Sequence, residues 1–560
     1  MKNSIYKILA LLVIGLIVGC KDYLDVTPES QFESDSFYSS PQEAEIALAG
    51  IYGVIASDQG YGRDLPVIAD AGTDETFYNR RFNENWGIAL YRNTPADDES
   101  FNIWTNQYQA INLANLFIES IEPANFETEE QFNALLAEAR FLRALCYFNL
   151  SNLWEEVPLR LSSSKNQEDN NEPAASLAEI YEAIIEDFEF ATQNLPHPTD
   201  PLFTEGRAHK LAAHGLLARV YLKMSGFPLK ENRYAEALAH ADSVISDGFH
   251  ALRTSNDTTG YELLFKDLIG GPYDAREVLF EISFQNLRDI GLLDVDGRHG
   301  NINGINFGSN STLGDPNGFA QTGVYPGLAN LFNQNLDKRY LWNIATFKRN
   351  SAGNIFPIAS ELAIRDFCPA KFRRWEPANF EDIAVDSDDE AFVELELDRV
   401  GELNRNFTNI NFPVLRYSDV LLMYAEAANE VSGGPTALGL QYFNEVRNRA
   451  GLWNLEDSAS TSAIAADQQL FFEELVDERS RELCFEGLRR FDLVRWELLE
   501  EKLIETKAIV EGHPDFSANN EDHLSTLRPA ENFNPAIHLS LPYPLVEVTI
   551  NQSLDQKDGW

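Results

Sequence analysis

The stretch EQFNALLAEARFLRALCYFNLSNL, residues 130–153, decides the fold of this chain. Its apolar residues recur at three- and four-residue spacing, which predicts a long amphipathic helix. Its alanines lie where a neighbouring helix must approach closely. Because such a helix buries its apolar face against other elements, we expect a mainly α-helical protein built from packed helices.

Similar helical patterns flank this stretch, and several of them come in pairs. The expected helices span residues 41–55, 101–121, 130–153, 176–195, 209–226 and 233–246, with a later pair at 418–431 and 436–451. Repeated helix pairs of about 34 residues are typical of tetratricopeptide (TPR) units, which stack because no unit buries its apolar face alone. We therefore expect a TPR-like scaffold of about four helical hairpins.

Between residues 251 and 410 the chain changes character and becomes rich in Gly, Asn, Asp and Phe, with strand-like pieces such as EVLFEISF at 277–284. We expect an inserted, irregular, loop-rich region with a few short strands. Long loops in an ordered domain usually carry function, because a rigid scaffold positions binding groups on its connections. Surface elaboration without a function is the alternative.

The first 20 residues, MKNSIYKILALLVIGLIVGC, have the features of a secretory signal. Lysines precede an apolar run from Ile8 to Val18, which is shorter than the roughly 20 helical residues that a membrane span needs. The final IVGC resembles a bacterial lipobox, in which the cysteine is acylated. We expect removal of residues 1–19, lipid on Cys20 and a tether over 20–40; a buried or disulfide-bonded cysteine is the alternative.

Composition limits the partners that this protein can bind. The formal net charge is −44, from 44 basic and 88 acidic residues, so nucleic acid and anionic lipid surfaces are repelled. Membrane contact must then come from the lipid alone. Cys146, Cys368 and Cys484 lack metal-ligand spacing, and the acidic run DSDDE at 386–390 lacks that of an EF-hand loop. We expect Cys146 and Cys484 to be buried packing residues, the acidic run to form a solvated loop, and no metal or other cofactor to be bound.

Several blocks, taken in order, resemble the SusD/RagB family of nutrient-binding outer-membrane lipoproteins of Bacteroidetes. The similarity begins at the Cys20 tether and LDVTPES and continues through NIWTNQYQAINLANLFIESI, AEARFLRALCYFNLSNLWEEVPL and GRAHKLAAHGLLARVYL. The most specific blocks are NFPVLRYSDVLLMYAEAANE, FNEVRNRAGL, VDERSRELCFEGLRRFDLVRW and LPYPLVEVTINQSLDQKDGW. The resemblance suggests a helical-repeat region over 41–250, the insertion at 251–410 and a C-terminal region over 411–560.

This resemblance implies a function at the cell surface without catalysis. A family member captures a glycan and delivers it to a SusC-like, TonB-dependent barrel in the outer membrane, over which the lipoprotein closes as a lid. Asp22 and Asp25, just after Cys20, resemble the export signal that sends such lipoproteins to the outer leaflet. We therefore expect a lipid-anchored protein of the outer membrane that faces the exterior.

Carbohydrate binding directs attention to aromatic residues on loops, because aromatic rings stack on the C–H faces of sugars while amides and charged groups bind the hydroxyls. Two polar segments, 72–93 and 301–342, contain such residues. The candidates in the first are Tyr78, Arg81, Asn85, Trp86 and Tyr91. Those in the second are Phe319, Tyr325 and Trp342. For each ring, packing into a small local core is the alternative to ligand binding.

Three other functions are compatible with the sequence. A RagB-like protein would bind peptides with the same fold and the same barrel partner. A surface glycoside hydrolase would need two carboxylates about 5 to 10 Å apart. Because the chain has 88 acidic residues, such pairs must occur anyway, and their presence does not indicate a hydrolase. A pure assembly adaptor would use its repeats to hold other proteins. The Glu/Arg-rich segment from Glu478 to Arg490 suits ion pairs within a helix, so we interpret it as scaffold and not as a catalytic centre.

Overall fold

A computed structural model describes residues 38–79, 87–255, 260–285, 296–306, 317–349, 355–358, 364–377, 392–395 and 406–560 of the chain. The expected signal peptide and most of the tether lie outside these residues, as does the DSDDE run. The helices are α2 (Pro41–Ala56), α3 (Asp64–Asp70), α4 (Asp98–Ser120), α5 (Glu129–Trp154), α6 (Leu177–Asn194), α7 (Lys210–Ser225), α8 (Tyr234–Asp247), α9 (Gly260–Gly270), α10 (Pro326–Leu331), α11 (Arg339–Asn343), α12 (Tyr417–Ser432), α13 (Ala437–Arg449), α14 (Gln468–Leu483), α15 (Arg489–Arg495), α16 (Leu499–Glu511), α17 (Glu521–Asn532) and α18 (Leu545–Ile550). The described 3-10 helices are η2 (Ile88–Leu90), η3 (Pro123–Asn125), η4 (Gln167–Asn170), η8 (Leu455–Asp457) and η9 (Ile464–Ala466).

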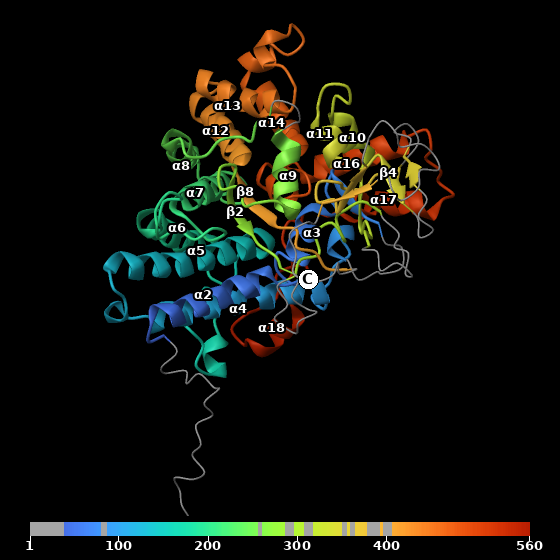
Figure 1. Ribbon diagram of the computed structural model, residues 1–560. Helices are drawn as coiled ribbons and strands as arrows, with labels where there is room; N and C mark the ends of the chain where they lie inside the picture. The colour runs from blue at the N-terminus through green and yellow to red at the C-terminus, as the bar shows by residue number, and fades with distance from the viewer. Residues whose placement is uncertain are drawn as a thin grey trace, which may run out of the picture.

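The expected helical stack is present and forms one side of the molecule (Figure 1). Helix α2 packs against α4, and contacts continue from α4 through α5, α6 and α7 to α8. Helix α12 then packs against α8, although Asp247 ends α8 and Tyr417 begins α12, and α13 completes the last pair. The prediction of a mainly helical, TPR-like scaffold with about four helix pairs is confirmed.

Local sequence explains where these helices begin. The Ser176 hydroxyl accepts a hydrogen bond from the Glu179 backbone N–H, and the Glu179 carboxylate accepts one from the Ser176 N–H, so α6 begins with a capping box. The side chains of Ser40 and Thr128 likewise cap α2 and α5, because each accepts a hydrogen bond from a backbone N–H in the first turn of its helix. Each cap satisfies a backbone donor that the helix itself leaves unpaired.

The short strands form two-stranded sheets within the described residues. They are β1 (Thr76–Tyr78), β2 (Val278–Ile282), β3 (Thr322–Val324), β4 (Phe347–Arg349), β5 (Ile355–Pro357), β6 (Trp375–Pro377), β7 (Phe392–Glu394) and β8 (Phe412–Arg416). The antiparallel pairs are β1–β3, β2–β8, β4–β5 and β6–β7. Most of these strands lie in the loop-rich region, on the side of the molecule opposite the stack (Figure 1). The expected insertion with a few short strands is thus present.

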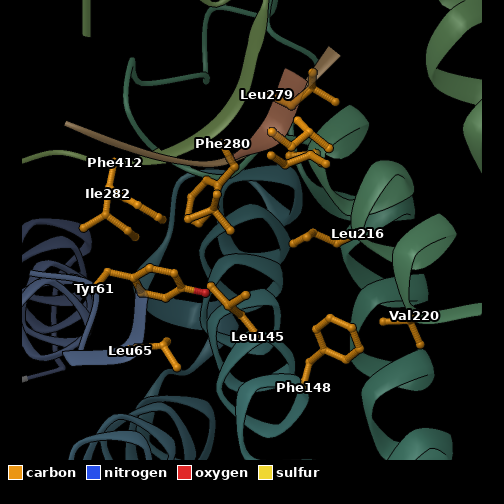
Figure 2. Close-up of a cluster of buried hydrophobic side chains, with 14 of the residues drawn as sticks. Tyr61, Leu65, Leu145, Phe148, Leu216, Val220, Leu279, Phe280, Ile282 and Phe412 are labelled. Atoms are coloured by element: carbon orange, nitrogen blue, oxygen red, sulfur yellow. The ribbon is translucent and has the colours of Figure 1, made fainter. Parts of the chain in front are cut away.

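The core is centred where β2 and β8 meet the helical stack. Figure 2 shows side chains of β2 pointing between α5 and α7 toward Leu145 and Leu216. The Phe280 ring lies edge-on to that of Phe141, with 5.0 Å between the centroids. Helix α7 comes close to the strands at Gly215, where a Cβ atom would lie 2.5 Å from a methyl group of Leu415. The two ends of the insertion are therefore joined to each other and to the stack.

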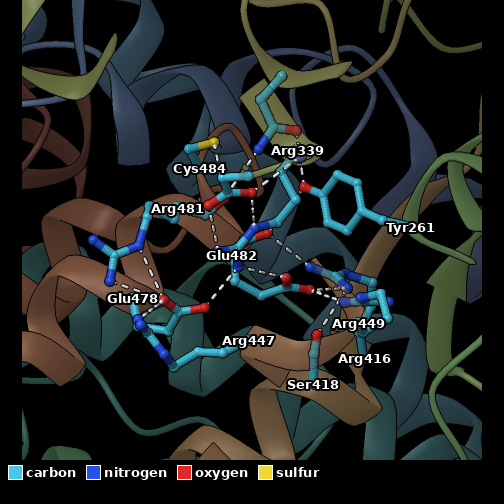
Figure 3. A network of polar contacts seen from close by, with 12 residues as sticks. Tyr261, Arg339, Arg416, Ser418, Arg447, Arg449, Glu478, Arg481, Glu482 and Cys484 are labelled. Atoms are coloured by element: carbon cyan, nitrogen blue, oxygen red, sulfur yellow. Dashed lines mark hydrogen bonds and ion pairs between the residues drawn. The ribbon is translucent and has the colours of Figure 1, made fainter. Parts of the chain in front are cut away.

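A buried network of ion pairs joins the insertion to the C-terminal helices (Figure 3). Arg339 of α11 pairs with Asp337 at 2.8 Å, and with Glu478 and Glu482 of α14 at 2.7 and 3.1 Å. Glu482 also pairs with Arg416 at 2.9 Å and with Arg449 at 2.5 Å. Their side chains are almost completely excluded from solvent.

The arginines of this network determine the protonation of its carboxylates. Burial alone would raise the pKa of Glu482, but Arg449, Arg416 and Arg339 outweigh that effect and hold the pKa well below its usual range. Burial acts in the same direction on Glu478, and its arginine partners lower the pKa to about 2. These carboxylates are therefore ionised and neutralised by their arginine partners, as expected for a structural segment.

The partners of this segment differ from the sequence expectation. Arg481 does pair with Glu478 within α14, at 2.8 Å. Glu486, however, pairs with Arg416, and Arg489 pairs with Asp74, each at no more than 2.7 Å. The expected intrahelical pairing is wrong for these residues because α14 and α15 are enclosed by other elements, whose charges lie closer than helix neighbours.

The sequence expectations also concern the cysteines and the apolar character of the helices. Cys146 and Cys484 are buried and free, as expected for packing residues, and Cys368 is buried and free as well. None of the described helices combines the length and the apolar character that crossing a bilayer requires.

We predict that Phe280→Ala lowers the free energy of unfolding by about 3–5 kcal/mol, because it leaves a cavity between the sheet and α5. Urea denaturation followed by circular dichroism measures the change. The control is Ile46→Ala, whose side chain is 56% exposed and whose loss should cost less than about 0.5 kcal/mol. Equal effects of both changes would contradict the placement of β2 in the core.

We also predict that Glu482→Gln destabilises the protein by about 3–5 kcal/mol, because it keeps the shape of the side chain but removes the buried negative charge that Arg339, Arg416 and Arg449 share. Thermal and urea denaturation provide the measurement. Glu497→Gln is the matched control, because its ion pair with Lys230 is half exposed and is worth less than about 1 kcal/mol. A Glu482→Gln protein as stable as the control would show that the network does not hold the insertion.

Candidate functional site

The two segments expected to carry the ligand site lie side by side in the structure. Strand β1 of the first segment pairs antiparallel with β3 of the second, with Thr76 opposite Val324 and Tyr78 opposite Thr322. Beyond the strands the pairing continues, because the Asn79 N–H donates to the Gln321 carbonyl oxygen at 2.7 Å. Segments more than 200 residues apart in the sequence thus form one structural unit.

Arg365 holds this unit in place. One of its guanidinium nitrogens donates to the Asn79 backbone oxygen at 2.8 Å and to the Asn79 side-chain oxygen at 2.6 Å. Another pairs with Asp522 of α17 at 2.6 Å, and the guanidinium lies 5.9 Å from the Phe77 ring centre. A single side chain therefore fixes the end of β1 against the C-terminal region.

Polar groups and one aromatic ring surround the contact between Arg365 and the end of β1, and we call these residues the polar rim. The polar rim consists of Asn79, Phe319, Gln321, Lys348, Arg365 and Asp366. Phe319 is half-buried, and its N–H donates to the Asn301 oxygen at 2.6 Å. Lys348 of β4 pairs with the exposed Asp366 at 2.6 Å. Strand β3 is bonded to the same segment, because the Val324 N–H donates to the Phe367 oxygen at 2.9 Å.

The groups of the polar rim suit a polyhydroxylated ligand. Amides, a guanidinium, an ammonium and a carboxylate can donate to or accept from hydroxyl groups, and a partly exposed ring can contact the C–H face of a sugar. Among the described residues, no group of three or more His, Cys, Asp or Glu side chains could hold a metal ion.

Most aromatic candidates that the structure describes are not on the surface. Tyr325 is 1% exposed; its hydroxyl donates to the Thr526 oxygen at 2.6 Å, and its ring centroid lies 5.0 Å from that of Phe77. Tyr91 is 2% exposed, and its hydroxyl donates to the Gly72 oxygen at 2.7 Å. The expectation that these two rings face a ligand is wrong, because each has its hydroxyl and its ring engaged inside the protein.

Trp342 and Tyr78 are buried as well. The Arg373 guanidinium lies 4.2 Å from the Trp342 ring centre, and the tryptophan is 3% exposed. Tyr78 is a buried residue of β1. Both side chains belong to the main hydrophobic core of the protein. These rings support the loops and offer no face to a ligand.

The other candidates have different outcomes. Arg81, Asn85 and Trp86 lie outside the residues that the structure describes, and they stay predictions. Phe319 is described, lies at the polar rim and is partly exposed.

Sequence reasoning missed most of the polar rim. Asn79 follows Tyr78 directly within the first candidate segment, so a search for amides as well as rings would have found it. Gln321 likewise lies in the second segment. Lys348, Arg365 and Asp366 lie beyond both segments, and long-range bonds bring them to the same place: Arg365 to Asn79, β3 to Phe367, and Lys348 to Asp366.

Comparison with known families and relatives agrees with this architecture. A family model described as the SusD family matches residues 292–560. A second, described as starch-binding and associating with the outer membrane, matches residues 22–222. The SusD-like protein P25 of Formosa agariphila is 25% identical over 557 residues, which cover 97% of this chain and 96% of that protein. A SusD-like protein of Bacteroides ovatus is 24% identical and covers 97% and 95%.

Solved structures share the fold over nearly the whole chain. A SusD homologue from Bacteroides thetaiotaomicron has a TM-score of 0.81 and 26% identity, with 95% of this chain and 100% of that chain covered. A laminarin-binding SusD-like protein has a TM-score of 0.67 and 22% identity, with 93% and 100% covered. The helical stack, the loop-rich insertion and both family models lead to one conclusion: the chain belongs to the SusD family.

Proposed function

We propose that this protein is a surface-exposed lipoprotein that binds poly- or oligosaccharides and delivers them to a SusC-like, TonB-dependent barrel in the outer membrane. It carries out no catalysis. The observation that carries the proposal is the β1–β3 pairing, which brings Asn79 beside the segment of Phe319 and Gln321 in the polar rim. The family description of starch binding and the laminarin-binding structural relative support a glycan as the ligand.

Sequence features outside the described residues support the location. The lipobox-like IVGC and the acidic residues Asp22 and Asp25 favour a lipid-anchored protein at the outer membrane that faces the exterior. The family description of association with the outer membrane agrees with this location. The net charge of −44 makes acyl chains, and not electrostatic attraction, the means of membrane attachment. A SusC-like barrel is the partner that the family relationship suggests.

The polar rim favours binding over hydrolysis. A glycosidase needs two carboxyl groups on either side of the scissile bond. Of the six rim residues only Asp366 is acidic, and nearby Asp522 is engaged by Arg365. The dense carboxylate cluster of α14 is buried among arginines, so it has no access to a substrate. A peptide ligand or a pure adaptor function would show in the following experiments.

We predict that Phe319→Ala weakens the binding of the preferred glycan about tenfold, which corresponds to about 1.4 kcal/mol, because the ring contacts the sugar. Isothermal titration of the detergent-solubilised protein against plant, algal and host polysaccharides, their oligosaccharides and a peptide mixture first identifies the ligand. The same titration then measures the variant.

Two further variants make this result specific. Phe319→Leu keeps an apolar side chain without a ring face and should lose nearly as much affinity as Phe319→Ala. Phe190→Ala removes another half-buried ring, on α6 in the helical stack, and should bind like the unmodified protein. Saturable heat with peptides alone would replace the glycan by a peptide ligand. Absence of heat with every ligand would favour an adaptor.

We further predict that Cys20→Ala abolishes lipid attachment, because no other residue of the lipobox-like sequence offers a thiol. Labelling of cells with a radioactive fatty acid, followed by isolation of the protein, measures acylation. Cys146→Ala is the control and should retain the label, because Cys146 is buried inside α5. Equal labelling of the Cys20→Ala protein would rule out the proposed anchor.

A further inference from the structure

A groove distant in the sequence from the polar rim lies between α4, the segment from Arg160 to Asn170 and α18. Its volume is about 380 Å³. We call it the α4–α18 groove. The residues of its lining on which the argument depends are Thr105, Gln109, Asn112, Arg160, Ser162 and Glu547.

We propose that the α4–α18 groove binds a neutral carbohydrate chain, as a second glycan site in addition to the polar rim. The inference rests on the proposed function, because it assumes that the ligand is a glycan. It assigns to the helical stack a role in binding as well as in support.

The floor of the groove is one face of α4. Thr105, Gln109 and Asn112 follow one another at helical spacing, so their side chains project from the same face. Thr105 and Gln109 are exposed, and their side chains make no hydrogen bond to any residue in the described part of the chain. The Asn112 side-chain oxygen accepts from the Ser164 N–H at 2.8 Å, while its amide nitrogen has no partner among the described residues. Apart from the Asn112 oxygen, the side-chain donors and acceptors of this floor thus have no partner in the described part of the chain.

The opposite wall is held rigidly. The Asn115 amide nitrogen donates to the backbone oxygens of Arg160 and Ser162, at 2.9 and 3.1 Å. The Arg160 N–H donates to the Tyr147 hydroxyl at 2.6 Å. Because buried side chains of α4 and α5 fix this wall, the groove is preformed, and a ligand does not have to order it.

Charge in the groove favours a neutral ligand. Arg160 and Glu547 pair at 3.0 Å, so the two ionised groups of the lining cancel. The Arg160 guanidinium lies 4.8 Å from the Tyr108 ring centre, and its Nε is buried without a partner in the described residues. Hydroxyl and amide groups and a neutralised ion pair together match the hydroxyl-rich surface of a sugar chain.

The test compares two variants of the complete protein on an array of neutral, uronic-acid-bearing and sulfated oligosaccharides and peptides. Thr105→Ala/Gln109→Ala removes the two exposed polar groups without breaking an internal bond, and we expect about tenfold weaker binding of neutral glycans of several units. Gln193→Ala, at an exposed position of α6, is the control and should bind like the unmodified protein. Hydrogen exchange should show protection of residues 105–112 and 160–164 by the best neutral glycan of the array.

The outcomes separate this inference from the proposed function. If Phe319→Ala weakens binding but the groove variant binds normally without protection at 105–112, the second site is wrong and the proposed function stands. If no glycan binds, both are wrong. Preference of the groove for anionic glycans or for peptides, measured as loss of those ligands in the groove variant alone, overturns the neutral class.

Discussion

The burial of charge between α11, β8, α13 and α14 is the constraint on which the rest of the structure depends. Moving one ion from water into a medium of low dielectric constant costs on the order of 20 kcal/mol in the idealised case, and only close partners offset this cost. Arg339, Arg416 and Arg449 come from three different parts of the chain and share the carboxylate of Glu482. None of these parts can pack without the others, so the network couples the insertion to the helical stack.

From this network a short series of backbone contacts leads to the polar rim. The Asn343 amide nitrogen of α11 donates to the Arg481 oxygen at 2.9 Å, and the Asn343 oxygen accepts from the Ala370 N–H at 2.8 Å. Three residues earlier, the Phe367 oxygen accepts from β3, which pairs with β1. The binding region is irregular in secondary structure, yet hydrogen bonds connect it directly to the most deeply buried part of the protein.

The scaffold could be predicted because its information is local: periodicity, caps and repeated pairs identify helices within a window of a few turns. The location of the candidate site could be predicted only to the level of segments. Tyr325 is buried by Thr526, Tyr91 by Arg490 and Trp342 by Arg373, and no local pattern reports partners so far away. The same reason explains the charges of α14, whose spacing suited intrahelical pairs while distant arginines lay closer. Long-range packing therefore determines both the burial of these rings and the partners of these charges.

The β2–β8 ladder has a consequence for how members of such a family diverge. The chain leaves the helical stack after β2 and rejoins it at β8, and neighbouring strands lie only about 4.8 Å apart. The entropic cost of closing a loop between fixed ends grows slowly with its length. The chain between β2 and β8 can therefore gain or lose tens of residues at little thermodynamic cost. Natural selection can therefore change the length of the insertion while the stack and the Arg339 ion pairs are retained. A chimaera that exchanges the insertion between relatives should therefore have its junctions at β2 and β8.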